Sequence, residues 1–243
     1  AGVNFKLLDA AGCRVVEPAL EAGTALTAGV YLPDAEVGNC RQFAIGLKAA
    51  LVERNVTFLF DHEVTALLTQ GRGVEVVAHE APQEATATLG LLSALPSGDP
   101  ATRLFDAVVL CAAIGSPALA RPLGLRLPIQ AVHGYAITFP VRHFEAYPDV
   151  GPRSALMDER YKVAISRLGD RMRVAGGAEL GGNRRDVNND ALATLYRVVE
   201  DWFPSAARQA KAQVWKGARP MLPDGPPAIG ASGTPGVWIN TGH

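Results

Sequence analysis

The sequence predicts a mixed fold, in which an α/β part with parallel strands is interleaved with an antiparallel α+β part. Residues 106–111, DAVVLC, form a nearly continuous apolar run that is typical of a strand buried on both faces of a parallel sheet. After residue 128, short apolar strands and a tight turn indicate antiparallel pairing instead. Two helices, at residues 39–54 and 188–203, carry apolar residues at helical spacing. The α/β part covers residues 39–68, 104–125 and 228–243, and the α+β part covers residues 1–35, 73–100 and 128–225.

Local sequence patterns predict each element in the first half of the chain. The helix at 39–54 has Asn39 as a capping residue at its start and Asn55 at its end. Residues 56–60, VTFLF, are β-branched and aromatic and predict a strand. Residues 63–68 and 73–79 predict a hairpin around the turn TQGRG. Residues 81–102 are rich in Ala, Pro, Ser and Thr and predict a connection with one weak strand at 88–92.

The second half begins with the apolar strand at 106–111, followed by a short helix at 117–122. Strands are expected at residues 131–141, 161–166 and 172–176, with Leu168-Gly169-Asp170 joining the last two. In the helix at 188–203 the apolar side chains form a single stripe. A Pro-rich loop at 219–227 and a final strand at 237–240 complete the order.

Composition excludes several classes of protein. The chain has 243 residues, of which 48% are hydrophobic and 19% charged, as in a folded globular protein. Its 23 basic and 24 acidic side chains give a net charge of -1, so the excess of positive charge that nucleic-acid binding requires is missing. No apolar run approaches the roughly 20 residues of a membrane-spanning helix, and no transmembrane segment is expected. The N-terminal residues do not resemble a signal peptide.

The common catalytic and ligand-binding motifs are missing from the sequence. There is no GxGxxG dinucleotide fingerprint, Walker loop, HExxH or GxSxG. Cys13, Cys40 and Cys111 form no CxxC pair, and the five histidines show no ligand spacing. We therefore expect neither a metal site nor a disulfide framework.

One segment has the character of a binding site. Prolines recur in the loop that begins at Arg219, and they restrict its backbone. A guanidinium at the head of a rigid loop is suited to bidentate binding of a carboxylate. Pairing of Arg219 with a protein acid such as Asp224 is the alternative, and spacing alone does not decide between the two.

Five segments together resemble the flavin-dependent amine oxidoreductases. They are DAVVLCAAIGSPALARPLGLRLP, HGYAIT, YKVAISRLGDRMRVAGGAELGG, WKGARPMLPDGPPAIG and WINTGH, in the family's order. Within the family, the small subunit of D-amino-acid dehydrogenases is most similar, and the glycine and sarcosine oxidases are more distant. The resemblance covers most of the chain and is weakest at residues 81–102.

The resemblance implies an antiparallel, mixed-sheet substrate domain interleaved with remnants of a Rossmann-like FAD-binding domain. The substrate domain would take residues 1–38 and 128–227, with 73–103 as a further part or a connection. The FAD-domain remnants would be residues 39–72, 104–127 and 228–243. The family's N-terminal GxGxxG unit and its helix after the Gly-His pair are not in this sequence. We therefore expect a fragment of a longer enzyme.

The resemblance also suggests site residues, none of which is catalytic through its side chain. Arg219 matches the family's carboxylate-binding arginine, and Tyr135 and Tyr161 are looser candidates for the substrate pocket, with core packing as an equal reading. His133 stands where relatives often carry Lys. Seven residues match positions near the cofactor: Val64, Ala112, Ala113, Gly115, Thr241, Gly242 and His243. The family's usual Ala-Gly-Ala order is altered to AAIG at residues 112–115.

The implied activity of the full-length enzyme is oxidation of the amine of a (D-)amino acid to an imine and then a 2-oxo acid, by hydride transfer to FAD. Flavin enzymes of 2-hydroxy acids or glycerol phosphate, and a catalytically silent substrate-binding or interaction domain, are the alternatives. Because the pyrophosphate-binding loop is missing, we expect this chain to be inactive and to bind no FAD. Apolar surface exposed by truncation leaves room for a homodimer. A cytoplasmic location is expected, with a peripheral position at the inner face of the membrane as an open alternative.

Overall fold

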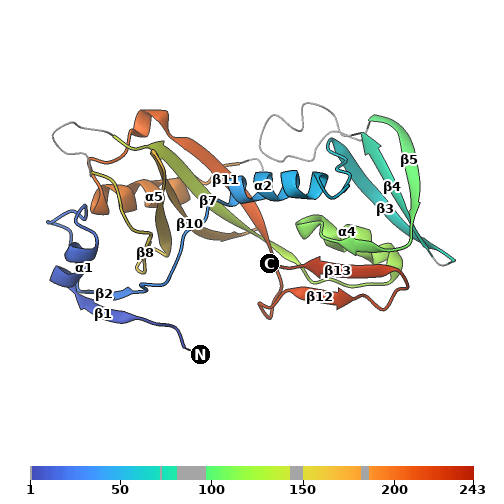
Figure 1. The fold of residues 1–243 in the computed structure, drawn as a ribbon, viewed down its shortest axis with the longest axis horizontal. Coiled ribbons are helices and arrows are strands. Elements are labelled where there is room, and N and C mark those ends of the chain that lie inside the picture. Colours follow the sequence, from blue (N-terminus) through green and yellow to red (C-terminus); the bar gives the residue numbers. More distant parts are fainter. Residues whose placement is uncertain (1, 72, 81–96, 143–149, 182–185) are drawn as a thin grey trace. The chain divides into compact units, whose positions relative to one another are not determined.

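A computed structural model describes residues 2–71, 73–80, 97–142, 150–181 and 186–243 of the chain. The chain divides into two compact units, each assembled from three separate segments, and the order of their elements is drawn in Figure 1. Unit 1 consists of Ala1–Thr57, Tyr135–Gly177 and Asn188–Trp215. Unit 2 consists of Phe58–Gly134, Ala178–Val187 and Lys216–His243.

A five-stranded sheet has the strand order β11-β7-β10-β9-β8. Its strands are β7 (Gln130–Pro140), β8 (Leu156–Asp158), β9 (Val163–Leu168), β10 (Arg171–Leu180) and β11 (Gln213–Met221). β9 pairs antiparallel with both β8 and β10, and the turn between β9 and β10 contains Gly169 with a φ of 65°. Three of the five strands, β7, β10 and β11, begin in one unit and end in the other. The antiparallel strands expected after residue 128 are confirmed.

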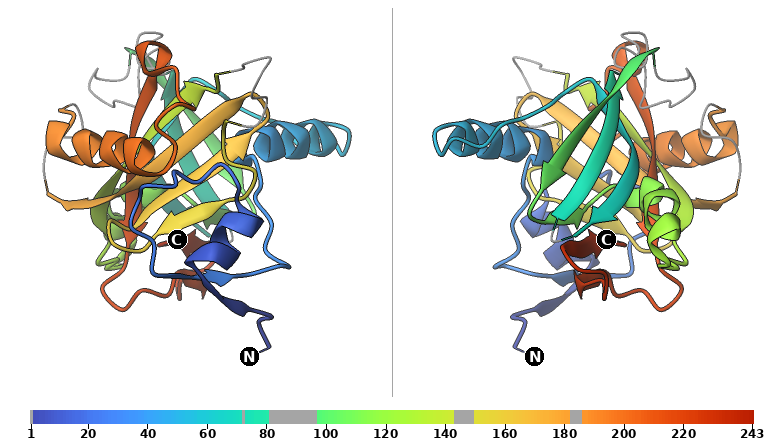
Figure 2. Two further views of the ribbon diagram at one scale, coloured as in Figure 1. Left: turned by 90° about the vertical axis from the view of Figure 1, so that its left-hand side faces the viewer. Right: turned by 90° about the vertical axis from the view of Figure 1, so that its right-hand side faces the viewer.

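The core of unit 1 lies between this sheet and helix α5 (Asn189–Trp202), which Figure 2 shows in orange beside the yellow strands. The side chain of Asn188 caps the helix by accepting hydrogen bonds from the backbone N–H groups of Asp190 and Ala191. Leu195, Val198 and Val199 are buried from the helix side. The predicted amphipathic helix is therefore confirmed, together with its cap.

The N-terminal part of unit 1 holds elements that the sequence did not indicate. Strands β1 (Lys6–Asp9) and β2 (Ala28–Tyr31) pair antiparallel, with helix α1 (Ala10–Val16) between them. The helix predicted at residues 39–54 is confirmed as α2 (Cys40–Val52), and Asn39 caps it by accepting from the N–H of Gln42. Its predicted apolar stripe is not buried, since Phe43 is 71% exposed and the helix has no buried residue.

In unit 2, strands β3 (His62–Gln70), β4 (Gly73–Glu80) and β5 (Ser97–Phe105) form an antiparallel sheet in the order β3-β4-β5, shown side by side in the right panel of Figure 2. The hairpin predicted around TQGRG is confirmed, although its first strand had been grouped with the parallel α/β part of the chain. β5 lies partly where a connection was expected, and the weak strand expected at 88–92 falls outside the described residues. The strand predicted at residues 56–60 was also wrong. Phe58 and Phe60 stack there at 5.7 Å, but no strand is assigned, because a strand needs a hydrogen-bonded neighbour as well as β-forming residues.

A second sheet of unit 2 has the order β12-β13-β6, with β6 (Val108–Leu110), β12 (Ala228–Ala231) and β13 (Val237–Thr241). β6 and β13 pair in parallel, as expected for DAVVLC. However, β6 is not buried on both faces, since Leu110 is 3% exposed and Val109 is 58% exposed. The expected short helix corresponds to three consecutive pieces, η1 (Ala113–Gly115), α4 (Ser116–Ala120) and η2 (Arg121–Leu123). A further short turn of helix, η3 (Gln209–Lys211), precedes β11.

Two kinds of feature were searched for across the described ranges. No helix there combines the length and apolar character that crossing a membrane requires. In the same part of the chain, no group of three or more His, Cys, Asp or Glu side chains could hold a metal ion.

Candidate functional site

The predicted site residues divide unequally between the two units. All seven residues matched to the cofactor lie in unit 2, as does Arg219, whereas Tyr135 and Tyr161 belong to unit 1. Unit 2 is therefore the part of the molecule in which a candidate site can be built from the residues upward.

An apolar pocket of about 270 Å³ opens in unit 2 between its two sheets and helix α4. Val64 reaches it from β3, and Ala112 from the turn that follows β6, so the structure brings these two predicted residues together. The remaining lining residues are also hydrophobic: Leu67, Val76, Val108, Val109, Leu110, Cys111 and Leu119. This volume is slightly below the roughly 300 Å³ at which ligand pockets usually begin, which suits one flat ring better than a whole dinucleotide.

The turn after β6 adopts a conformation unusual for its sequence. Ala113 has a φ of 48°, in the left-handed region that favours glycine. The Oγ1 of Thr241 lies 3.4 Å from the carbonyl oxygen of Ala113, to which it donates, and accepts from Ser116 Oγ at 3.2 Å. Thr241 and Ser116 are both buried. These contacts tie the end of β13 to the turn at residues 112–115, so Ala113 and Thr241 also meet.

The chain end after β13 contacts the loop that follows β11. Gly242 has a φ of 90°, and a Cβ at this position would lie 2.7 Å from Cδ1 of Leu222. A larger residue would therefore clash with the loop as well as strain the backbone. His243 is exposed, and its Nε2 lies 2.7 Å from Oδ1 of Asn240.

Arg219 lies on strand β11, and the prediction that it starts a loop was wrong. The strand continues to Met221, and the turn begins with Leu222, whose carbonyl accepts from the N–H of Gly225. The guanidinium of Arg219 lies over Gly134 of β7, the neighbouring strand. Arg219 is an exposed residue of unit 2, as a substrate-binding side chain requires.

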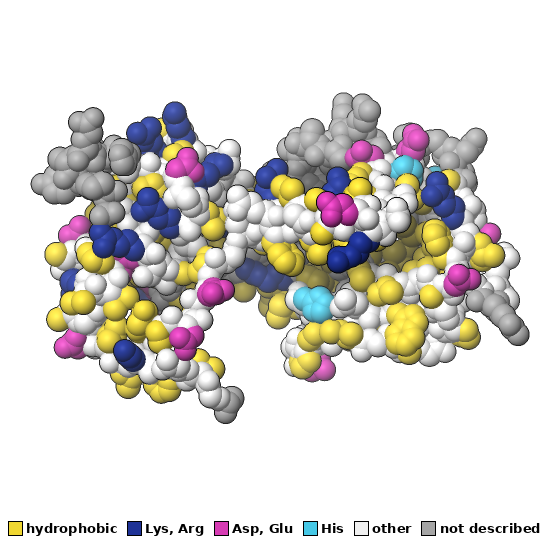
Figure 3. Space-filling model, viewed as in Figure 1, with side chains coloured by type: hydrophobic (Ala, Val, Ile, Leu, Met, Phe, Trp, Pro, Cys, Tyr) yellow, Lys and Arg dark blue, Asp and Glu magenta, His cyan; other side chains and the backbone are white. Residues whose placement is uncertain are grey.

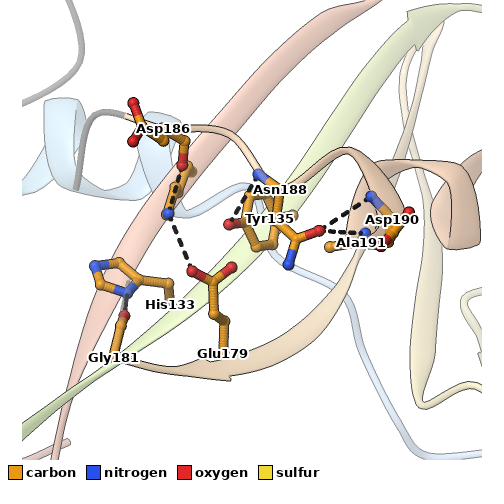
Figure 4. A network of polar contacts seen from close by, with 9 residues as sticks. His133, Tyr135, Glu179, Gly181, Asp186, Asn188, Asp190 and Ala191 are labelled. Carbon is orange, nitrogen blue, oxygen red and sulfur yellow. Dashed lines mark hydrogen bonds and ion pairs between the residues drawn. The ribbon is translucent and has the colours of Figure 1, made fainter. Parts of the chain in front are cut away.

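The two tyrosines have different surroundings. Tyr135 is 1% exposed and belongs to the core of unit 1, where its hydroxyl accepts a hydrogen bond from the backbone N–H of Asn188 at 3.3 Å (Figure 4). It follows Gly134 on β7, so its side chain points to the opposite face of that strand. Tyr161 is half-buried against the same core, and the guanidinium of Arg160 lies 5.1 Å from its ring centre. Both positions are those of packed core residues.

Sequence reasoning missed a buried polar cluster in unit 2, which Figure 4 also shows. The side chain of Lys216 is 5% exposed, pairs with Glu179 at 3.5 Å and donates to the carbonyl oxygen of Asp186 at 2.7 Å. His133 is 3% exposed, its Nδ1 lies 3.1 Å from the carbonyl oxygen of Gly181, and its Nε2 has no partner among the described residues. No spacing signal could have revealed this cluster, because its members come from three separate segments.

The family model described as FAD dependent oxidoreductase (DAO) matches residues 1–243. The chain belongs to this family. The resemblance seen in the five sequence segments is thereby confirmed. The D-amino acid dehydrogenase of Rhizorhabdus wittichii is 38% identical over 243 residues, which cover 100% of this chain and 53% of that protein. The D-amino acid dehydrogenase of Xanthobacter autotrophicus is 41% identical over 99% of this chain and 52% of its own length.

Solved structures of other proteins share the fold at low sequence identity. The crystal structure of glycine oxidase from Geobacillus kaustophilus matches with a TM-score of 0.77 and 20% identity, over 100% of this chain and 58% of that one. The crystal structure of L-proline dehydrogenase from P. horikoshii matches with a TM-score of 0.74 and 14% identity, over 99% of this chain and 59% of that one. The mixed α+β class with antiparallel sheets is thus confirmed, and the chain spans about half the length of the curated relatives.

The residues of unit 2 fit part of the family's cofactor. The apolar pocket at Val64 and Ala112 suits an adenine ring, since its lining consists of hydrophobic side chains. For the two charges of the pyrophosphate, the sequence offers no glycine-rich loop leading into a helix. The fit therefore concerns the adenosine end and the residues after β13, and extends no further.

Proposed function

We propose that the full-length protein oxidises the amine of a D-amino acid, and that this chain supplies its carboxylate anchor and part of its FAD-binding surface. The observation that carries the proposal is the position of Arg219. Its guanidinium lies at the surface of unit 2, over the backbone of β7. The loop after its strand reaches Gly242 through Leu222, next to residues that the family places beside the flavin.

Arg219 would bind the α-carboxylate through two parallel N–H···O contacts, which fix the position and the plane of that group. With the carboxylate fixed, contacts to the amine and the side chain need only select one face of the α-carbon for reaction. FAD, when bound, would supply the acceptor for the α-hydrogen as hydride, and water would hydrolyse the resulting iminium of the substrate to a 2-oxo acid and ammonium. Val64 and Ala112 would hold its adenine end, and Thr241, Gly242 and His243 would lie beside its ring.

No side chain of this chain is assigned a proton-transfer role. The ammonium group of the amino acid must lose one proton before the α-hydrogen leaves as hydride. Water can accept this ammonium proton. Positioning and cofactor chemistry therefore suffice for the reaction, and the sequence's lack of a catalytic triad or carboxylate pair is compatible with it.

The alternative functions differ from the proposed one in the substrate that they would bind. An oxidoreductase of 2-hydroxy acids would use the same carboxylate anchor, and one of glycerol phosphate would bind a dianion instead. A catalytically silent interaction domain would use neither. Oxidation of a D-amino acid is favoured over these alternatives by the relatives of 38% and 41% identity, which are named D-amino acid dehydrogenase.

The test is anaerobic reduction of the full-length protein in the presence of FAD, followed by the loss of flavin absorbance. D-alanine, L-alanine, D-lactate and glycerol 3-phosphate are compared at equal concentration. The proposal expects bleaching with D-alanine and release of pyruvate and ammonia. Bleaching by D-lactate or glycerol 3-phosphate alone, or by none of the four, would contradict it.

A further inference from the structure

Gly134 lies on β7 directly against the guanidinium of Arg219, which projects from the neighbouring strand β11. A Cβ atom built on Gly134 would lie 2.4 Å from Nη2, 2.6 Å from Cζ and 2.6 Å from Nη1 of Arg219. Ordinary van der Waals contact of a Cβ begins at 3.4 Å. Only a residue without a side chain therefore allows the guanidinium to occupy this place.

The distances also define how the guanidinium is turned. Its central carbon and both terminal nitrogens are almost equally far from the Cβ position, at 2.4 to 2.6 Å. These distances place the Cβ position obliquely above the Nη1–Nη2 edge, so the outer end of the guanidinium rests on Gly134. The N–H donors of a guanidinium lie in its plane. The tilt of this plane, and with it the direction of the donors, therefore depends on the contact with Gly134.

Strand β7 itself can accept a small side chain at this position. The three nearest atoms to the added Cβ all belong to the guanidinium, which is the far end of a flexible side chain. Gly134 is not among the glycines with positive φ, so alanine is compatible with its backbone. An alanine should therefore displace the guanidinium by about 1 Å, from 2.4 Å to 3.4 Å, and leave the fold intact.

We propose that Gly134 is a positioning residue, which sets the height and tilt of the Arg219 fork and thereby its fit to an α-carboxylate. This inference rests on the proposed function of Arg219 as the carboxylate anchor. It adds a residue that never touches the substrate but determines where the substrate is held. A misplacement of about 1 Å can reduce the rate of a well-aligned reaction by on the order of 100-fold. Binding alone should suffer less, because the charge of Arg219 remains.

The experiment is a double-mutant cycle on the 243-residue chain. Gly134→Ala is combined with Arg219→Lys, because a lysine ammonium has no plane to rest on position 134. D-Alanine is titrated as the probe, with D-alaninamide as the control that lacks the carboxylate. Gly46→Ala is the matched control, since no atom lies within 4 Å of its added Cβ. Amide chemical shifts give the dissociation constants, and the Arg219 Nε–Hε resonance reports on the guanidinium directly.

The proposal expects Gly134→Ala to shift the Arg219 Nε–Hε resonance and to weaken D-alanine binding about tenfold. In the Arg219→Lys background the same change should weaken binding less than twofold, and Gly46→Ala should do neither. An equal loss in both backgrounds would show a merely structural role and overturn the inference, as would an unmoved resonance. Arg219→Ala is measured as a further variant, and unchanged D-alanine binding there would instead overturn the proposed function of Arg219, so the two failures are distinguishable.

Discussion

The apolar strands are buried more completely in the core of unit 1 than in the sheet β12-β13-β6 of unit 2. In unit 1, helix α5 covers the strands and the cluster includes large side chains such as Phe139 and Phe203, both at most 1% exposed. In unit 2, the sheet β12-β13-β6 buries one face, and leaves Val109, Trp238 and Ile229 between 50% and 68% exposed on the other. Figure 3 shows hydrophobic side chains gathered over the region of β12 and β13.

This difference indicates that residues of unit 2 bind ligands and that residues of unit 1 mainly stabilise the fold. Unit 1 has the packing of a scaffold, and its two candidate tyrosines are part of that packing. Unit 2 has an open apolar pocket, a strained turn at Ala113 and the exposed Arg219. Substitutions in unit 2 should therefore change ligand binding, and substitutions in unit 1 should change the free energy of unfolding.

Replacing Arg219 should have the largest effect. In the full-length protein, Arg219→Ala should raise the KM for the amino acid by about 30- to 1000-fold, since a charge-assisted bidentate contact contributes about 2–4 kcal/mol. Arg219→Lys should restore only part of this, because an ammonium cannot form the fork. Steady-state kinetics are the measurement, and Asp224→Asn is the control. If Asp224→Asn reproduced the effect of Arg219→Ala, the arginine would be paired with that carboxylate instead.

Glu17 should be a stability residue of unit 1. Its buried carboxylate accepts hydrogen bonds from the backbone N–H groups of Arg153 and Ser154, both at 2.7 Å. Both of these N–H groups donate to Oε2, and the N–H of Ala19 donates to Oε1 at 3.3 Å. Glu17→Gln places an amide NH2 against one of these donors, so it should destabilise unit 1 by about 1–3 kcal/mol. Hydrogen exchange measures this separately for each unit. Glu21→Gln, at an exposed carboxylate that accepts from the N–H of Gly23 at 3.2 Å, is the control and should change little. Equal loss of protection in unit 2 would contradict the division.

Ala113 should be the site of a stabilising change in unit 2. Its φ of 48° costs an alanine about 1–2 kcal/mol that a glycine does not lose. Ala113→Gly should therefore raise the free energy of unfolding of unit 2 by roughly 1 kcal/mol. Ala112→Gly is the matched control, because Ala112 has a φ of -82° and gains nothing from glycine. Urea denaturation followed through hydrogen exchange gives both values, and a loss of stability in Ala113→Gly would show that the turn is not strained.

The homodimer expected from the sequence stays a prediction, and the exposed apolar face of unit 2 is where it would form. The exposed face with Val109, Trp238 and Ile229 is the surface through which a second copy would associate. Sedimentation velocity over a range of concentrations tests it. A monomer at all concentrations would show that this face does not drive self-association.

The sequence predicted correctly those elements whose determinants all lie within one short segment. Helix α5 has its cap at Asn188 and its apolar stripe in one short segment, so the sequence contains all that specifies it. The β3–β4 hairpin is likewise encoded by its turn. Residues 56–60 have strand-forming side chains, but no neighbouring strand pairs with them in the described part of the chain. Pairing is a property of distant segments, and periodicity does not report it.

The same reason separates the predicted and unpredicted parts of the site. Arg219 could be singled out because its side chain and its proline-rich context are local features. Its contact with Gly134 could not, because it depends on which strand lies beside β11 in the sheet. The buried Lys216–Glu179 pair was missed for the same reason.

Chemical-shift mapping of the isotope-labelled 243-residue chain with FAD tests the central claim, that unit 2 alone carries the ligand-binding residues. No stable FAD complex is expected, because the sequence has no glycine-rich loop for the pyrophosphate, and only transient contacts in fast exchange should be seen at high FAD concentration. Shifts should be confined to unit 2, around Val64 and Ala112, which line the apolar pocket. Amides of the unit 1 core, including Tyr135 and Tyr161, should not move. Stoichiometric binding at micromolar affinity, or shifts of equal size in unit 1, would contradict the account.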